Sequence, residues 1–285
     1  MQIKNLENCS KQQLYKAFLS AFQDYEIKVD MSFEQFKSIT WSKDFKPCLS
    51  VGSFENEELT GFVFTGVRTR KGSMSAYDIA TGVTAGSRNI GIGSVLLEHL
   101  LVTLKSAGVS NFFLEVLEKN SAARHLYEKY GFEICRRLEC FWKDTDAVKK
   151  QPMPETGLAI GHDSSAVKDL DPVLFHSFEP AWQNEFATWL NLIEEHELVT
   201  LSDGDKVIAY AIVHSTGGTV LQFGIHPEHR GQSVEKQLIS LLAERTEAEK
   251  MRFINMEEGS PLCAFLREQG FNNDINQYEM VYYFK

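Results

Sequence analysis

A Gly-rich turn is the part of this sequence best suited to binding a ligand. It lies between an expected strand and a long expected helix, and it consists of Arg88, Asn89, Ile90, Gly91, Ile92, Gly93 and Ser94. Glycine lets the backbone approach a ligand without a Cβ clash. The first N–H groups of a helix attract anions because they have no partner within the helix, and Arg88 would add a charged fork. The turn therefore predicts a phosphate or pyrophosphate site, unless it is only a connection.

Two other phosphate-binding motifs do not fit this turn. The dinucleotide motif G-x-G-x-x-G/A needs a small residue where Leu96 stands, because a bulky side chain there prevents close packing of the helix. A P-loop needs a Lys followed by Ser or Thr after its last glycine, and this sequence lacks that ending.

Apolar spacing predicts the elements that must position the turn. In the first half we expect helices over 11–24 and 33–41, strands over 48–54, 60–67 and 75–83, a helix from the turn to about 107, a strand over 111–117, a helix over 121–130 and a strand from 132. A similar order follows residue 157, with helices over about 165–196, strands over 197–202, 206–214 and 219–226, a helix over 233–248, a strand over 252–256, a helix ending at Gly270 and a strand over 279–284.

Two aligned segments indicate that this order is a duplication. The segment ending at Arg88 aligns with the one ending at Arg230, and Tyr127–Phe132 aligns with Leu266–Phe271 at nearly the same offset. The segment between the copies is polar, holds two prolines and lacks periodicity. We therefore expect a first domain over 1–145, a linker over 146–157 and a second domain over 158–285.

The turn and a second motif resemble a known family. The pattern R-x-x-G-x-G after a strand ending in Val83 is similar to the coenzyme A pyrophosphate loop of the GNAT acetyltransferases. Leu114-Glu-Val116, followed by Asn120-x-x-Ala123-x-x-Leu126-Tyr127 and Gly131-Phe132, resembles that family's second signature. The resemblance covers about 1–142 well and 158–285 weakly. It implies an α/β fold of two tandem domains, each a mixed, mostly antiparallel sheet flanked by helices, with acetyl-CoA as cosubstrate and no metal.

The resemblance also implies a set of site residues. Those expected to contact the coenzyme are Val83, Arg88, Asn89, Ile90, Gly91, Ile92, Gly93, Ser94, Asn120 and Tyr127. Main-chain groups around Ile79 to Val83 would hold the thioester arm. Tyr127 would protonate the departing sulfur, since a phenol is protonated at neutral pH. The alternatives are that Tyr127 is only a core-facing aromatic and that Asn120 only caps a helix.

The base that deprotonates the amine has two candidates, the strand carboxylates Asp78 and Glu115. Successive side chains of a strand point to opposite faces, so Tyr77 and Asp78 share a face only if the strand contains a bulge. Either carboxylate could instead be held in a salt bridge away from the substrate.

The second half lacks the residues that the site needs. Ser233 stands in the place of Gly91, Glu235 in that of Gly93, Gly259 in that of Asn120 and Leu266 in that of Tyr127. A carboxylate at Glu235 would oppose a pyrophosphate. We expect this copy to bind no coenzyme A, and either to complete the substrate pocket or to stabilise the first domain.

The charge is uneven along the chain. Residues 1–150 hold 20 Lys and Arg against 18 Asp and Glu, whereas the remainder holds 9 against 21. This balance disfavours nucleic acid and favours a cationic small molecule or basic peptide, unless it serves only solubility.

No apolar run is long enough to span a membrane. The five scattered cysteines include no C-x-x-C, which favours reduced thiols in the cytoplasm. His226 and His229 lack an evident third metal ligand.

The sequence therefore predicts an N-acetyltransferase. It would transfer acetyl from acetyl-CoA to a primary amine of a small molecule or peptide by direct attack in a ternary complex, since no Cys or Ser constellation favours an acyl-enzyme. A non-catalytic acyl-CoA-binding sensor or interaction module is the alternative, and a longer acyl donor stays open. The sequence does not indicate the oligomeric state.

Overall fold

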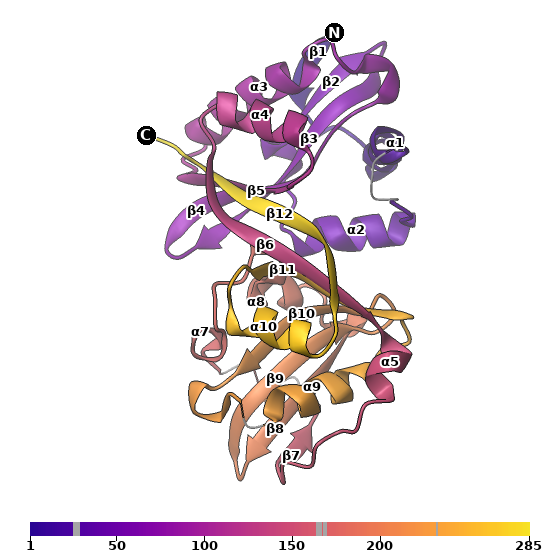
Figure 1. Cartoon of the computed structure of the whole chain (residues 1–285). Coiled ribbons are helices and arrows are strands. Elements are labelled where there is room, and N and C mark those ends of the chain that lie inside the picture. Colours follow the sequence, from indigo (N-terminus) through magenta and orange to yellow (C-terminus); the bar gives the residue numbers. More distant parts are fainter. Residues whose placement is uncertain (25–28, 164–166, 168–169, 232) are drawn as a thin grey trace. The chain divides into compact units, whose positions relative to one another are not determined.

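Two compact units make up the chain. Unit 1 comprises Met1–Cys135 together with Tyr278–Lys285, and unit 2 comprises Arg136–Gln277. The structure is a computed structural model, and it describes residues 1–285 except 25–28, 164–166, 168–169 and 232 (Figure 1). The predicted limits of 1–145 and 158–285 are stretches of continuous sequence, whereas unit 1 also contains the residues after Gln277.

The sheet of unit 1 is antiparallel except for one pair of strands. Antiparallel pairs join β1 (Gln2–Asn5) to β2 (Val51–Glu55), β2 to β3 (Glu58–Arg70) and β3 to β4 (Ser73–Val83). β4 then pairs in parallel with β5 (Asn111–Leu117), and the end of β12 (Asn272–Tyr283) follows β5 in the strand order. A parallel pair needs a crossover, which α3 (Ile92–Ser106) supplies.

Helices cover both faces of this sheet. β3 alternates, so Phe62 and Phe64 lie in one buried cluster with residues of α1 (Lys11–Phe22) and α2 (Phe33–Ser42), and Val63 lies in another with residues of α3. α4 (Ser121–Lys129) contributes Tyr127 to the second cluster. The first two helices begin with capping boxes in which Ser10 pairs with Gln13 and Ser32 with Gln35.

Unit 2 repeats this arrangement. β7 (Ala159–Gly161), β8 (His196–Asp203), β9 (Lys206–His214) and β10 (Thr219–Ile225) form successive antiparallel pairs. β10 pairs in parallel with β11 (Lys250–Glu257), and β11 pairs antiparallel with β6 (Glu133–Asp144). α9 (Val234–Ala243) connects the parallel pair, and α10 (Pro261–Glu268) follows β11. The expected α/β class with mixed, mostly antiparallel sheets is therefore confirmed.

The structure differs from the expected helices over about 165–196. The described part of this stretch contains only short pieces, which are α7 (Pro172–Phe175), α8 (Phe186–Leu190) and 3₁₀ turns at Trp182–Asn184 and Ile193–Glu195. Residues 164–166 and 168–169 of the expected helix lie outside the described residues. Pro172 and Pro180 explain part of the difference, because proline disfavours helical backbone in the residue before it. A further short helix, α5 (Thr145–Lys149), lies at the start of the predicted linker.

Two further observations bear on the cysteines and on membranes. Cys9, Cys48, Cys135, Cys140 and Cys263 are all free. Among the described residues, no helix has both the length and the apolar character that crossing a bilayer requires.

Candidate functional site

The Gly-rich turn enters α3 through left-handed backbone. Asn89 has a φ of 63° and Gly91, the N-cap of α3, a φ of 86°. Asn tolerates this region, and glycine adopts it without a Cβ penalty. A Cβ atom added to Gly91 would meet no atom within 4 Å, so backbone conformation and not lack of space favours glycine there.

The turn leaves a row of main-chain donors available. Val95 N donates to Gly91 O over 3.2 Å, which begins the helical ladder. Within the described part of the chain, the N–H groups from Asn89 to Ser94 have no protein acceptor. Such donors at the positive end of a helix form an anion site. The turn predicted to bind pyrophosphate therefore presents main-chain donors suited to an anion.

The side chain of Arg88 faces the protein and not an open anion site, contrary to the expected charged fork. Its Nε donates to Val83 O over 3.1 Å and its Nη2 to Ala21 O over 2.9 Å. Nη1 and Nη2 also donate to the two carboxylate oxygens of Asp24, each over 2.7 Å. The hydrogen bond from Arg88 is the main reason that the pKa of Asp24 is lowered. Arg88 thus fastens the turn to the end of β4 and to the end of α1.

β4 and β5 separate beside this turn. Their parallel pairing covers Ser75, Ala76 and Tyr77 of β4 and stops there, although β4 continues to Val83 and β5 to Leu117. β4 also contains a bulge, because Thr65 pairs with Asp78 and the preceding Phe64 pairs with Ala80. The bulge follows Asp78, because Tyr77 and Asp78 pair with the consecutive residues Gly66 and Thr65, so the alternation between these two side chains is unchanged.

Asp78 and Tyr127 meet where the strands separate. The Tyr127 hydroxyl donates to Asp78 Oδ2 over 3.2 Å, and Thr81 Oγ1 donates to the same oxygen over 2.6 Å. The side chains are 9% and 7% exposed, respectively, for Asp78 and Tyr127. Burial raises the pKa of Asp78 from 3.8 to about 6, against the lowering effect of these hydrogen bonds and of Lys43. Asp78 Oδ1 is buried and accepts no hydrogen bond.

Glu115 belongs to the same cluster but has a different hydrogen-bond partner from Asp78. It accepts a hydrogen bond from the Tyr77 hydroxyl. Burial, followed by the charge of Glu115, raises the pKa of Tyr77 well above its usual value. The ammonium of Lys43 lies 5.6 Å from the centre of the Tyr77 ring. Burial lowers the pKa of Lys43, although the charges of Glu115 and Asp78 act to raise it. The pKa of Asp78, at about 6, lies close to neutrality.

Two predicted site residues also have the structural roles that the sequence left open. Asn120 caps α4, since its side-chain oxygen accepts from Ala123 N over 3.1 Å. Tyr127 is a core aromatic whose ring lies 5.5 Å from that of Phe132, while its hydroxyl reaches Asp78. The structure adds Lys43 and Thr81 to the cluster. No sequence signal links Lys43, at the end of α2, to this site.

The corresponding turn of unit 2 has the same backbone and different donors. Ser233 is the left-handed N-cap of α9 with a φ of 66°. Arg230 Nε donates to Ile225 O over 3.1 Å. Gly231 N donates to Glu235 Oε1 over 2.8 Å, so a carboxylate of the protein occupies a main-chain donor at this position.

His226, Glu228 and His229 lie beside this second turn. Their possible ligand atoms lie within 4.8 Å of one another. The side chain of Glu228 is 75% exposed, and exposed groups of this kind are common without a metal. The expectation that the protein uses no metal stays a prediction.

Comparison with known proteins finds the same fold and motifs elsewhere. A model described as the acetyltransferase (GNAT) family matches residues 11–132 and 165–271. In the solved tandem GNAT protein from the clavulanic acid biosynthesis pathway, 98% of the chain aligns with 99% of this one. The TM-score is 0.73 and the sequence identity 14%, so this likeness shows the fold. The expectation of two tandem domains of one fold is confirmed.

Curated relatives match parts of this chain. N-alpha-acetyltransferase 50 of Danio rerio is 30% identical over 107 residues, which are 35% of this chain. The ribosomal protein bS18-alanine N-acetyltransferase of Haemophilus influenzae is 32% identical over 130 residues, which are 46% of this chain and 80% of that protein. The chain spans 64% of the length of the Danio rerio protein.

Proposed function

The chain belongs to the acetyltransferase (GNAT) family, and on that premise we propose that unit 1 transfers an acetyl group from acetyl-CoA to a primary amine. The observation that carries this proposal is the contact between Tyr127 and Asp78 at the point where β4 and β5 separate. The Tyr127 hydroxyl, as the acid, and Asp78, whose pKa is raised to about 6, as the base, stand together there, close to the turn whose main-chain donors have no acceptor among the described residues.

Binding of the coenzyme would rest on the main chain. The N–H groups from Asn89 to Ser94 would donate to the diphosphate, and Gly91 and Gly93 let it approach closely. The separated edge of β4, up to Val83, offers main-chain groups to the thioester arm. Arg88 contributes by fixing the turn, because its guanidinium is bonded to Asp24 and to two carbonyl groups.

Asp78 is the proposed base. With a pKa of about 6, its carboxylate is mostly ionised at pH 7 and yet basic enough to take a proton from an ammonium group, directly or through water. Its buried Oδ1 has no hydrogen-bond partner among the described residues. Glu115 is the alternative base; it accepts a hydrogen bond from Tyr77, whereas Asp78 contacts Tyr127, the proposed acid.

The transfer itself is a direct attack in a ternary complex. The ammonium gives one proton to Asp78, which passes it to solvent, and the lone pair of the neutral amine forms the N–C bond to the acetyl carbon. The nitrogen then gives its second proton to Asp78, and the C–S bond breaks. Tyr127 gives its proton to the departing sulfur and is reprotonated from solvent or from Asp78, whose Oδ2 it contacts. The atoms then balance as an amide and a free thiol.

The acceptor is proposed as a primary amine of a small molecule or a peptide, with preference for cationic ones. The names of the relatives point to amines at the starts of proteins: one is an N-alpha-acetyltransferase and the other acts on an alanine of a ribosomal protein. Peptides with a free α-amine therefore belong among the first substrates to test. Five free cysteines support the further proposal of a reducing, cytoplasmic location.

A thiol-release assay tests the proposal. The purified full chain is mixed with acetyl-CoA and a panel of polyamines, aminoglycosides and peptides with free or blocked α-amines. Steady thiol production with at least one amine is expected, and Tyr127→Phe should lower turnover by about 10²-fold with little change in coenzyme affinity. Tight coenzyme binding without turnover on any amine would instead favour a sensor. Unchanged turnover in Tyr127→Phe would remove Tyr127 from the mechanism.

A further inference from the structure

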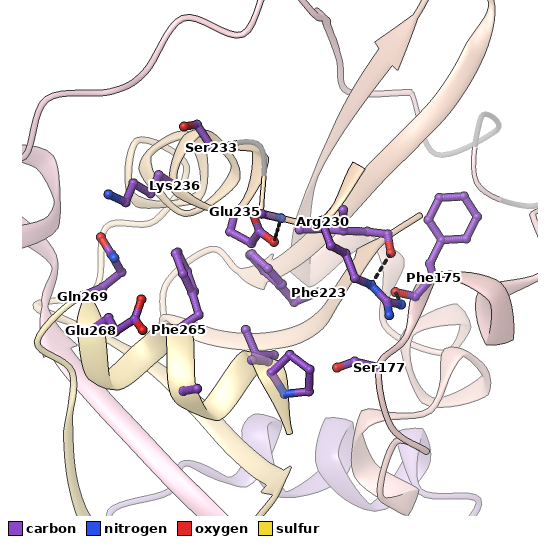
Figure 2. Close-up of a pocket in the computed structure, with 15 residues that line it drawn as sticks. Phe175, Ser177, Phe223, Arg230, Ser233, Glu235, Lys236, Phe265, Glu268 and Gln269 are labelled. Carbon is purple, nitrogen blue, oxygen red and sulfur yellow. Dashed lines mark hydrogen bonds between the residues drawn. The ribbon is translucent and has the colours of Figure 1, made fainter. Parts of the chain in front are cut away.

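Unit 2 contains a cavity at the place where its own parallel strands separate. Among the described residues, β10 and β11 pair at Thr219 with Arg252 and at Val220 with Phe253. The cavity opens beyond these pairs, between α9 and α10 (Figure 2). Its volume is about 580 Å³, which lies in the range of small-molecule sites. Its apolar walls are formed mainly by Phe175, Phe223, Ile225, Leu262 and Phe265.

This cavity is a poor site for a diphosphate. Glu235 brings a carboxylate to the start of α9, where its Oε1 accepts from Gly231 N over 2.8 Å. A phosphate would have to displace this carboxylate and would be repelled by it. The ligand of the cavity must therefore differ from the coenzyme proposed for unit 1.

Arg230 on the cavity wall lacks the counter-ion that its equivalent has. Arg88 and Arg230 each donate to the end of the preceding strand, and each donates to a second carbonyl, Ala21 O or Phe175 O. Arg88 is also paired with Asp24, whereas Arg230 has no carboxylate partner among the described residues, and its Nη1 makes no hydrogen bond to them. A half-buried guanidinium beside apolar walls is stabilised by an anion.

A carboxylate stands on the other side of the cavity. Figure 2 shows Arg230 and Ser177 on one side, and Glu268 and Gln269 of the α10 end on the other, with Phe223 and Phe265 between them. Glu268 forms no ion pair with the described residues. The remaining cation of the wall, Lys236, is exposed, as Glu268 is, and in Figure 2 it lies on the same side of the view as Gln269. The cavity thus has the guanidinium of Arg230 on one side, the carboxylate of Glu268 on the other and aromatic surface in the middle.

We propose that this cavity binds a short apolar peptide with free termini. Its carboxylate would take the place beside Arg230 that Asp24 fills beside Arg88, its ammonium would face Glu268, and its side chains would lie against Phe223 and Phe265. A single amino acid carries its two charges on one carbon, so a peptide suits charges on opposite walls better. This site is independent of the acetyl transfer proposed for unit 1.

Calorimetry with the full chain, in the absence of acetyl-CoA, tests the ligand chemistry. The probes are Leu-Phe, its C-terminal amide and its N-acetyl form. Removing either charge should weaken binding by about tenfold or more, since hydrogen bonds to charged groups are among the stronger ones. Hydrogen exchange should show protection of α10 by Leu-Phe. The proposal is overturned if Leu-Phe does not bind, if all three bind equally, or if coenzyme A and not Leu-Phe protects α10.

Matched variants test the two charged walls. Ser177→Asp places a carboxylate beside Arg230 and should weaken Leu-Phe binding by about tenfold, whereas the isosteric Ser177→Asn should bind nearly as the wild type does. Glu268→Gln should weaken Leu-Phe but not its N-acetyl form, and the exposed Glu249→Gln serves as a charge control. Equal binding in Ser177→Asp and Ser177→Asn would contradict the role of Arg230. Thiol release by unit 1 is measured in each variant, so that failure here is separate from failure of the proposed transfer.

Discussion

The two turns that lead into α3 and α9 share a backbone and differ in what they leave open. Gly91 and Ser233 adopt the same left-handed N-cap, and Arg88 and Arg230 fasten both turns to equivalent carbonyl groups. In unit 2, however, Glu235 occupies a main-chain donor that has no protein acceptor in unit 1. The left-handed N-cap therefore forms with either Gly or Ser, and the side chain of Glu235 accounts for the donor that is occupied in unit 2.

The largest expected effect concerns Asp78, the base proposed for unit 1. Asp78→Asn removes the proton acceptor while keeping the size of the side chain, so turnover should fall by about 10²–10⁴-fold with little change in coenzyme affinity. Glu115→Gln is the matched control, and its turnover should fall much less. Steady-state kinetics give the turnover of both variants. An equal loss in both variants would mean that Asp78 is not the base.

Thermal unfolding tests whether Asp78→Asn loses turnover because the protein is destabilised. Burial raises the pKa of Asp78, so the folded state disfavours the ionised form and gains stability as the pH falls through about 6. At pH 7 the uncharged Asn should therefore not lower the unfolding midpoint.

The next largest effect is expected when a carboxylate is introduced into the turn of unit 1, as Glu235 introduces one in unit 2. Gly91→Glu introduces a carboxylate at the amide donors and a side chain at a φ of 86°, where L-residues are strained. Coenzyme affinity should fall by about 10²-fold or more, because charge repulsion and strain act together. Gly86→Glu adds the same charge to an exposed position without positive φ and should bind far better. Calorimetry measures the coenzyme affinity of both variants. Similar affinities would mean that the main-chain amides near Gly91 do not bind the coenzyme.

The pH profile should reflect the same carboxyl group. Because the base acts when ionised, kcat/KM should be nearly constant above pH 7 and fall about tenfold per unit below an apparent pKa of about 6. The Tyr127 hydrogen bond lowers that pKa. In Tyr127→Phe the acidic limb should thus move to higher pH. If the limb stays in place, the group that titrates in the profile is not Asp78.

The smallest expected effect comes from the ion pair present only in unit 1. Asp24→Asn would leave Arg88 with its carbonyl partners, as Arg230 has in unit 2. The pair is exposed, so the unfolding midpoint should fall slightly, more at low salt than at high salt. A large loss of coenzyme affinity would show that the pair also shapes the amide row.

Much of the architecture was predictable because it is periodic or duplicated. Apolar spacing and the repeated turn predict both sheets, and the R-x-x-G-x-G pattern predicts the turn with its left-handed Gly91. The partners of Arg88 were not predictable, because Asp24 and Ala21 are distant in sequence. The bulge in β4 depends on the register with β3 and has no local signal.

The catalytic cluster was predictable only in part. Asp78, Glu115 and Tyr127 could be chosen by residue type and position, yet the preference for Asp78 depends on burial and on Thr81, which only the folded chain supplies. Lys43 enters through the packing of α2, which no motif marks. The stretch after residue 170 shows the opposite error, because the spacing predicts helices over about 165–196 where the structure has only short helical pieces.

Unit 1 is completed by residues that follow unit 2 in the chain. Met280 is fully buried in the cluster that holds α3 and Tyr127. During translation the acetyltransferase core would therefore lack one of its strands until the second copy has been synthesised. A fragment of residues 1–145 would have the proposed catalytic groups but would lack the end of β12, which follows β5 in the strand order, so it should be less stable than the full chain.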